Sequence, residues 1–376
     1  MSGRNVAPGP AGSSPAGRIG IVGAGILGVR IARELVGPGA DGAATNGGVQ
    51  LVTRRSDRRD QLTSSFGESL GVVLAEHGHP SLLEGTSVVI VSRESAAHVE
   101  EVRHHVRLGR HVVSTADDPE VVGELLELRS DAVAKGVRVV LGAAMSPGLS
   151  CLLARHAASE LHRVDEIHVA RQGAAGPACA RQRLRALRGS GVDWRDGEWL
   201  RRPGFSGREL CWFPDPVAAR DCYRAALPEP VLLVPSFPGV QRVTSRLAAT
   251  RRDRALAPFP VLLPPPSEGG LGAIRVELRG ELDGERASVI YGALDRPAVA
   301  AAGVAAVVAL RLLVEPGAPG VGGVASLEDP LGLLRELARR GVRAARFEGA
   351  GSADPVENLA ESVQFTAGPA EEPHAE

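Results

Sequence analysis

Short, continuously apolar runs alternate with amphipathic stretches from residue 18 to residue 145. The runs are rich in Val, Ile and Leu, as strands buried on both faces of a parallel sheet are. Helical periodicity separates them, most clearly over Ser95–Leu108 and Pro119–Lys135. This alternation predicts an α/β fold with a doubly wound parallel sheet. The predicted strands are Ile19–Val22, Val49–Thr53, Leu70–Leu74, Val88–Ser92, His111–Ser114 and Val137–Leu141.

The pattern changes after Gly142. A helix is predicted over Gly148–Leu161 and a strand over Asp165–Arg171, and the residues that follow are typical of a long, loop-rich stretch. Pro258–Pro266 holds too many prolines for a central strand, which indicates a rigid connection.

Apolar and polar residues then alternate over Ile274–Arg279 and again over Arg286–Tyr291. Asp283-Gly284 lies between the two runs and is a strong hairpin signal. Ile274, Val276 and Leu278 would share one apolar face, which predicts an antiparallel sheet buried on one side. We therefore expect a second, α+β domain.

These patterns divide the chain at loops and at changes of composition. Helices are predicted over Ile26–Val36, Pro297–Leu313 and Pro330–Arg340, and Gly37–Gly48 is typical of a flexible surface loop. The predicted parts are a disordered tail (1–17), a first domain (18–147), a second domain (148–295), a C-terminal helical segment (296–350) and a second disordered tail (351–376).

The composition is that of a soluble globular protein. Of 376 residues, 44% are hydrophobic and 23% charged, and the net charge of −1 gives no reason to expect nucleic acid or a membrane surface as partner. Residues 1–17 lack the apolar core of a signal peptide, and Ala298–Leu310 is too short to span a bilayer. The four cysteines and ten histidines show no metal-ligand spacing. We expect a cytoplasmic protein without a metal site.

A glycine fingerprint follows the first predicted strand directly. Gly23-Ala24-Gly25-Ile26-Leu27-Gly28 has the GxGxxG spacing and opens a predicted helix, the context that the motif requires. Gly23 would permit the tight turn, Gly25 would let the backbone approach a pyrophosphate, and Gly28 would let the helix pack on the sheet. The helix N-terminus would then bind the diphosphate. This predicts a Rossmann dinucleotide-binding domain.

The end of the second strand distinguishes between the two nicotinamide cofactors. An NAD site places an Asp or Glu there for the ribose 2′-hydroxyl. Here the strand ends in Thr53-Arg54-Arg55, and two guanidinium groups could pair with a 2′-phosphate. A solvated arginine cluster is the alternative. We predict NADP(H) as the cofactor.

Other candidates lie where strands end, since ligands bind beyond the carboxyl edge of such sheets. Ser92 and Arg93 would border the nucleotide, and Thr115 the nicotinamide. Asp117 is the best-placed group for proton transfer, although it could instead cap the next helix together with Asp118.

Residues farther along would bind a small-molecule substrate. Ser146 and Gly148 open a helix whose free N–H groups could bind a carboxylate, with simple capping as the alternative. Arg246 could bind a carboxylate from the second domain. His168 is a second acid/base candidate.

Together with the fingerprint, three later stretches resemble the saccharopine dehydrogenase-like (saccharopine reductase) superfamily. They are Gly109–Thr115, Gly142–Ser150 and Gly341–Gly349. The resemblance implies an NADP-linked enzyme that oxidises or reduces a C–N bond, an imine or secondary amine, of an amino-acid-derived substrate. It also implies C-terminal helices that return to the first domain, and a homodimer in which the second-domain sheet takes part.

The scarcity of lysine argues against two other dehydrogenase classes. Lys135 is the only lysine. Gfo/Idh-type enzymes look similar in architecture but carry Glu-Lys-Pro where this chain has Thr115–Pro119, and short-chain dehydrogenases need a Tyr-xxx-Lys pair that is absent. Intact glycines without a defined acid/base group are also what a catalytically degraded NADP-binding sensor or scaffold would show, so that alternative stays open.

Overall fold

The computed structural model describes residues 18–37, 48–75, 83–93, 97–256, 269–347 and 353–355. Most of the predicted loop at 37–48, the proline-rich connection and nearly all of both predicted tails lie outside these residues.

The first domain is built on a parallel sheet of seven strands, in the order β15-β6-β5-β4-β1-β2-β3. The strands are β1 (Arg18–Val22), β2 (Val49–Thr53), β3 (Gly71–Leu74), β4 (Thr86–Val91), β5 (His111–Ser114), β6 (Arg138–Leu141) and β15 (Gly320–Gly323). In β1 and β4, Ile19, Ile21 and residues 88–91 are fully buried, so both faces of the sheet are covered there, as the continuous apolar sequence predicts. The doubly wound parallel sheet is confirmed.

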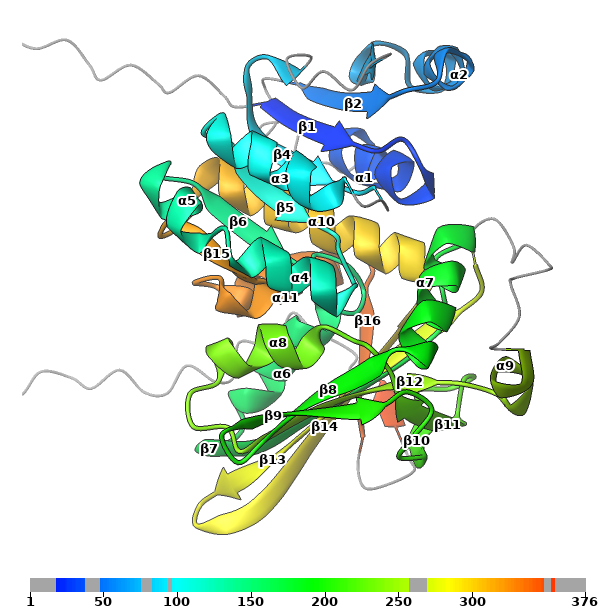
Figure 1. The fold of residues 1–376 in the computed structure, drawn as a ribbon, viewed down its shortest axis with the longest axis vertical. Helices are drawn as coiled ribbons and strands as arrows, with labels where there is room; N and C mark the ends of the chain where they lie inside the picture. The colour runs from blue at the N-terminus through cyan, green and yellow to red at the C-terminus, as the bar shows by residue number, and fades with distance from the viewer. Residues whose placement is uncertain are drawn as a thin grey trace, which may run out of the picture.

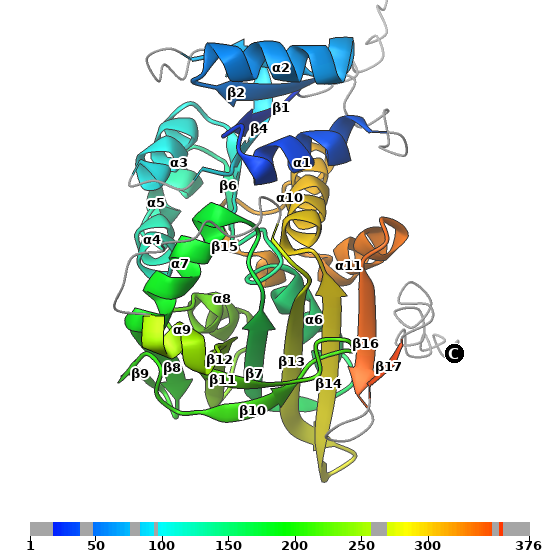
Figure 2. The same ribbon diagram turned by 90° about the vertical axis from the view of Figure 1, so that its right-hand side faces the viewer.

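Helices cover both faces of this sheet (Figure 2). On one side, α1 (Ile26–Val36) packs against α10 (Pro297–Val314), and on the other lie α3 (His98–Arg107), α4 (Pro119–Leu126) and α5 (Arg129–Ala134). The single helix predicted over 119–135 is wrong, because the helix breaks at residues 127–128. Neither Gly nor Pro marks that break, so the periodicity alone could not reveal it. Beyond β2, α2 (Ser56–Phe66) packs beside β3.

The second domain is a mixed sheet of ten strands below the first domain (Figure 1). Its strands are β7 (Arg163–Gln172), β8 (Ser190–Arg195), β9 (Glu198–Pro203), β10 (Glu209–Trp212), β11 (Ala219–Arg224), β12 (Arg242–Ala248), β13 (Gly272–Leu282), β14 (Glu285–Asp295), β16 (Arg343–Phe347) and β17 (Ala353–Pro355). The main path runs β10-β11-β12-β7-β13-β14-β16-β17, with the β8–β9 hairpin attached to β12.

The prediction of a loop-rich stretch after residue 171 is wrong. Five strands and the helices α7 (Pro177–Arg188), α8 (Glu229–Leu233) and α9 (Arg251–Leu256) lie between β7 and β13. The strands β8 to β11 are short, β9 and β11 carry two Arg each, and β9 is largely exposed. These strands therefore lack the clear apolar alternation that predicts a half-buried strand.

The predicted hairpin is confirmed. β13 and β14 pair in continuous antiparallel register around a turn in which Asp283 and Gly284 have φ of 52° and 84°. Positive φ at both positions is what a tight two-residue hairpin turn requires. Ile274, Val276 and Leu278 are at most 1% exposed and face α6 (Leu149–Ala158).

The C-terminal segment joins both domains. α10 packs on α1, β4 and β5 and β15 pairs with β6, whereas β16 extends the second sheet beside β14. Between them, α11 (Pro330–Arg339) packs on α6 and α10. Residues 353–355, within the segment predicted as a tail, form β17 and pair with β16.

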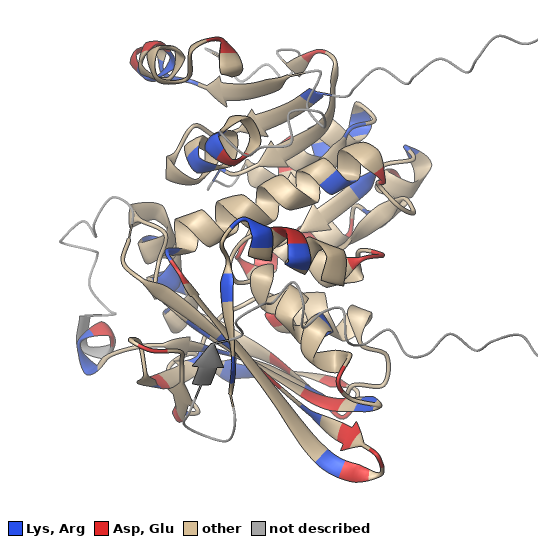
Figure 3. Cartoon of the chain, turned by 180° about the vertical axis from the view of Figure 1, so that it is seen from behind, with Lys and Arg blue, Asp and Glu red and all other residues tan. Residues whose placement is uncertain are grey.

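Among the residues that the structure describes, one helix is long and apolar enough to cross a membrane, by length and composition alone. That helix is α10, which Figure 3 shows crossing the back of the first domain with few charged residues. Because 72% of it is buried inside the protein, it is a core helix.

Candidate functional site

A cavity of about 410 Å³ opens at the carboxyl edge of the first sheet. It lies beside β1, where the strand order reverses between β2 and β4. Crossovers leave such a point toward opposite faces, which makes room for a ligand. The lining residues are Val22, Gly23, Ala24, Gly25, Val52, Thr53, Arg54, Arg55, Arg58, Ala75, Leu83, Arg93, Glu101 and His105.

Steric contacts account for two of the three fingerprint glycines, and open space lies beside the third. Gly23 has φ of 114°, and a Cβ there would lie 3.2 Å from the Ser92 backbone. A Cβ on Gly28 would lie 1.8 Å from the Gly23 carbonyl oxygen, so this glycine allows α1 to meet the turn. A Cβ on Gly25 would meet no atom within 4 Å. That open space faces the N-terminus of α1, and a diphosphate fits there because the first helical N–H groups lack helical partners.

Arginines form the opposite side of the cavity. Arg55 forms an exposed ion pair with Asp57, which lowers the pKa of that carboxyl through its hydrogen bond and charge. Arg58 donates to Gln61 at 2.6 Å. Arg54 is exposed and has no hydrogen-bond or ion-pair partner among the described residues. An anion that binds in the cavity could therefore pair with Arg54 without displacing another side chain from it.

The third side of the cavity is formed after β4. Ser92 Oγ lies 3.2 Å from the Gly23 carbonyl, so it supports the turn. Arg93 pairs with Glu101 at 2.9 Å, with both side chains 17% exposed. Glu101 also lies 3.4 Å from buried His105. Burial opposes ionisation of Glu101, but the hydrogen bond and charge of His105 and the Arg93 charge bring its pKa below the usual value.

His98, a buried histidine that the sequence analysis did not single out, connects the loop after β4 with the end of β5. His98 Nδ1 lies 2.8 Å from the Arg93 carbonyl, which can only accept, so Nδ1 carries the proton. Nε2 must then accept from Ser114 Oγ, also at 2.8 Å. Ser114 Oγ in turn accepts from the amide of Ala116 at 3.3 Å. Burial lowers the pKa of His98, which favours this neutral form.

The predicted nicotinamide side lies at the end of β5. Thr115 directs both its amide and its Oγ1 to the Val91 carbonyl, at 3.2 and 3.3 Å. Asp117 follows on the same loop, and its Oδ2 lies 3.7 Å from Arg171 Nη2 at the end of β7. Arg171 Nη1 donates to the Ser146 carbonyl after β6. The structure thus brings Asp117 to the junction between the domains.

Asp118, which follows Asp117 on this loop, is the N-cap of helix α4. Asp118 Oδ1 accepts from the Glu120 amide at 2.9 Å and caps α4. Its Oδ2 accepts from Gln182 of α7 at 2.8 Å, which ties the two domains together. The cap of α4 is therefore Asp118 and not Asp117.

Comparison with family models and with curated proteins gave no match. Among solved structures, apo saccharopine dehydrogenase (L-Glu forming) from Saccharomyces cerevisiae matches with a TM-score of 0.63 and 14% identity, over 88% of this chain and 100% of that chain. The chain has the saccharopine dehydrogenase fold. A diaminopimelate dehydrogenase from C. glutamicum matches with a TM-score of 0.45 and 16% identity, over 88% of this chain and 100% of its own.

Within this saccharopine dehydrogenase fold, the first N–H groups of the helix that Ser146 and Gly148 open already have partners. The amides of Leu149 and Ser150 donate to the carbonyls of Ala144 and Met145. A Cβ on Gly148 would lie 2.1 Å from the Ala144 carbonyl oxygen, so this glycine serves a tight turn. The Ser146 hydroxyl donates to buried Glu229.

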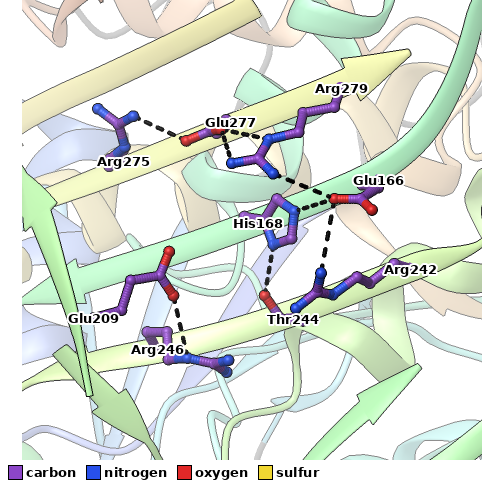
Figure 4. A network of polar contacts seen from close by, with 9 residues as sticks. All are labelled: Glu166, His168, Glu209, Arg242, Thr244, Arg246, Arg275, Glu277 and Arg279. Carbon is purple, nitrogen blue, oxygen red and sulfur yellow. Dashed lines mark hydrogen bonds and ion pairs between the residues drawn. The ribbon is translucent and has the colours of Figure 1, made fainter. Parts of the chain in front are cut away.

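His168 and Arg246 lie on the outer face of the second sheet (Figure 4). His168 bridges Thr244 and Glu166, at 2.8 Å each, and burial lowers its pKa, partly offset by Glu166. Arg246 is 5% exposed and pairs with Asp193 and Glu209. Arg171, three residues after His168 on β7, points to the opposite face. The structure therefore does not bring His168 and Arg246 together with Asp117.

No group of three or more His, Cys, Asp or Glu side chains arranged to hold a metal occurs within the described ranges. The four cysteines carry free thiols, and burial raises the pKa of Cys151 to about 12. That thiol is therefore a poor nucleophile.

Proposed function

We propose that this protein is an NADP(H)-dependent oxidoreductase that acts on a C–N bond, an imine or secondary amine, of an amino-acid-derived substrate. The observation that carries the proposal is the open space beside Gly25 at the N-terminus of α1, which we call the cradle. Arg54 lines the same cavity on its opposite side. The cradle suits a diphosphate, and the arginine suits a further phosphate on the adenosine ribose. The resemblance to the saccharopine dehydrogenase-like superfamily and the shared fold support the choice of a C–N bond.

Two groups at the domain junction support chemistry of this kind. Oxidation of an amine removes a hydride from carbon and a proton from nitrogen, and NADP⁺ would accept the hydride. Asp117, 28% exposed at its side chain, is the carboxylate placed to take the proton, or to return it in reduction. The only lysine, Lys135, is exposed just after α5 and lies outside this junction.

Arg171 is the group at the junction that fits a substrate carboxylate. Its side chain is 12% exposed, and a carboxylate can accept both hydrogen bonds of a guanidinium fork. A substrate carboxylate on Arg171 would compete with Asp117 for that charge. Binding would then weaken the ion pair between Arg171 and Asp117.

The experiment mixes purified protein with NADPH and a panel of 2-oxo acids with amines, followed by nicotinamide absorbance. Consumption of NADPH with at least one pair, lost in Asp117→Asn but retained in Asp118→Asn, supports the proposal. Tight NADPH binding without turnover would favour the alternative of a catalytically inactive sensor. Absence of NADPH binding would refute both.

A further inference from the structure

Glu229 is a carboxylate that the proposed chemistry does not use, although it is fully buried. It opens α8, where Pro230, Leu232 and Leu233 are also buried. Burying a carboxylate among such residues is unfavourable unless it is hydrogen-bonded. Its presence at this position therefore calls for a role that an apolar side chain could not fill.

Two buried hydroxyls point at this carboxylate from the two domains. Ser146 Oγ, on the loop after β6, donates to Oε1, and Ser245 Oγ, on β12, donates to Oε2 at 3.2 Å. The two serines are 7% and 4% exposed. Each oxygen of the Glu229 carboxyl group thus has a serine hydroxyl as its hydrogen-bond partner.

The same serine peptide also holds the arginine at the domain junction. The Ser146 carbonyl accepts from Arg171 Nη1, and Arg171 Nη2 lies 3.7 Å from Asp117. A chain of contacts thus runs from Ser245 through Glu229, Ser146 and Arg171 to Asp117. Glu229 holds the Ser146 side chain through its hydroxyl. The Ser146 carbonyl in turn holds Nη1 of the Arg171 guanidinium.

We propose that Glu229 is a positioning residue that orients Arg171 for a substrate carboxylate. This inference rests on the proposed function. A guanidinium held on one side by a fixed carbonyl loses little further freedom on binding a ligand, which strengthens binding. Glu229 itself touches neither substrate nor cofactor.

The test uses Glu229→Gln, which keeps the shape but has one oxygen acceptor, and Ser146→Ala, which keeps the carbonyl. Ser146→Thr, which restores a hydroxyl, is the matched control. Binding of 2-oxoglutarate to the NADPH complex, followed by nicotinamide fluorescence, should weaken about tenfold in the first two variants, the scale of one hydrogen bond to a charged group. The threonine variant should recover most of the affinity, and NADPH binding should stay unchanged in all three.

Two further measurements separate positioning from loss of fold. In an Arg171→Ala background, Glu229→Gln should have no additional effect on 2-oxoglutarate binding. In the ligand-free protein, phenylglyoxal should label Arg171 faster in Glu229→Gln and Ser146→Ala than in wild type, as measured by peptide mass spectrometry.

The two proposals fail in different ways. Unchanged labelling of Arg171, or an additive effect in the Arg171→Ala background, would overturn the role of Glu229. Faster labelling in a protein that binds no 2-oxoglutarate would support the role of Glu229 and count against the proposed substrate class.

Discussion

Replacing Arg54 by alanine should remove most of the preference for NADPH over NADH. Arg54 lines the cavity without a partner among the described residues, whereas Arg55 is paired with Asp57. Of the two arginines that the sequence singles out, the structure therefore favours Arg54 as the main contact to a 2′-phosphate. Arg55→Ala should weaken NADPH binding less, because its charge is already offset by the neighbouring carboxylate.

The expected size follows from the exposure of the site. A hydrogen bond between charged groups contributes about 1.5–3 kcal/mol, and an exposed one belongs at the lower end. We expect wild-type protein to bind NADPH at least about tenfold more tightly than NADH, equivalent to about 1.4 kcal/mol. Arg54→Ala should lose about that factor for NADPH and almost nothing for NADH.

Calorimetric titration of both cofactors at two salt concentrations checks this. Raising the salt should weaken NADPH binding in wild type more than in Arg54→Ala, since exposed charges are screened. Arg59→Ala is the matched control, because Arg59 lies on α2 and pairs with Asp60 but does not line the cavity. Equal affinities for NADPH and NADH in wild type, or an unchanged ratio in Arg54→Ala, would refute the reasoning.

The other predictions concern the cradle, the second sheet and a buried histidine. Gly25→Val should abolish NADPH binding and leave the melting temperature nearly unchanged, because its side chain would fill space that is open in the protein; wild-type affinity would show that the phosphates bind elsewhere. Leu278→Asp, at a fully buried position, should destabilise the protein by about 3 kcal/mol or more in denaturant unfolding, and a loss below 1 kcal/mol would contradict the assigned packing. If the protein is a homodimer through the outer face of the second sheet, Arg279→Glu should yield monomers by light scattering without loss of fold, whereas a monomeric wild type would remove that hypothesis. Burial lowers the pKa of His98 below its usual 6.5, so the unfolded chain binds more protons than the folded one and stability should fall as the pH drops below that value. Between pH 7.5 and pH 5, the melting temperature of His98→Asn should therefore fall less than that of the wild type. An equal fall in the two proteins would contradict the assignment.

The first domain could be predicted because its signals are local. Six of the seven parallel strands are short runs rich in Val, Ile and Leu, and the glycine fingerprint lies directly between a strand and a helix. The seventh strand, β15, was not predicted, because three of its four residues are glycine. The second domain gave such signals only in β7 and the β13–β14 hairpin. A strand such as β9, almost wholly exposed, exists because β8 supplies hydrogen-bond partners, and that pairing leaves no trace in its own composition.

The candidate site was predictable to a similar extent. The cradle residues lie in one short segment, but the pairing of Asp117 with Arg171 joins residues from different domains. Strand periodicity places His168 and Arg171 on opposite faces of β7, yet only the tertiary structure shows that the face of Arg171 meets the first domain. Glu229 did carry a signal, since it is a lone carboxylate in an otherwise apolar segment, Leu227–Leu233.

The C-terminal segment crosses between the two domains more than once, which limits how far the domains can rotate relative to each other. The chain passes to the second domain after β6, returns with α10 and β15, and passes down again into β16. A hinge made of several separate connections must bend them all together, which restricts the rotation that a single linker would allow. Opening and closing around a ligand should therefore be small in amplitude. A cofactor would enter through the exposed mouth beside Gly25 and Arg54 rather than through a wide separation of the two halves.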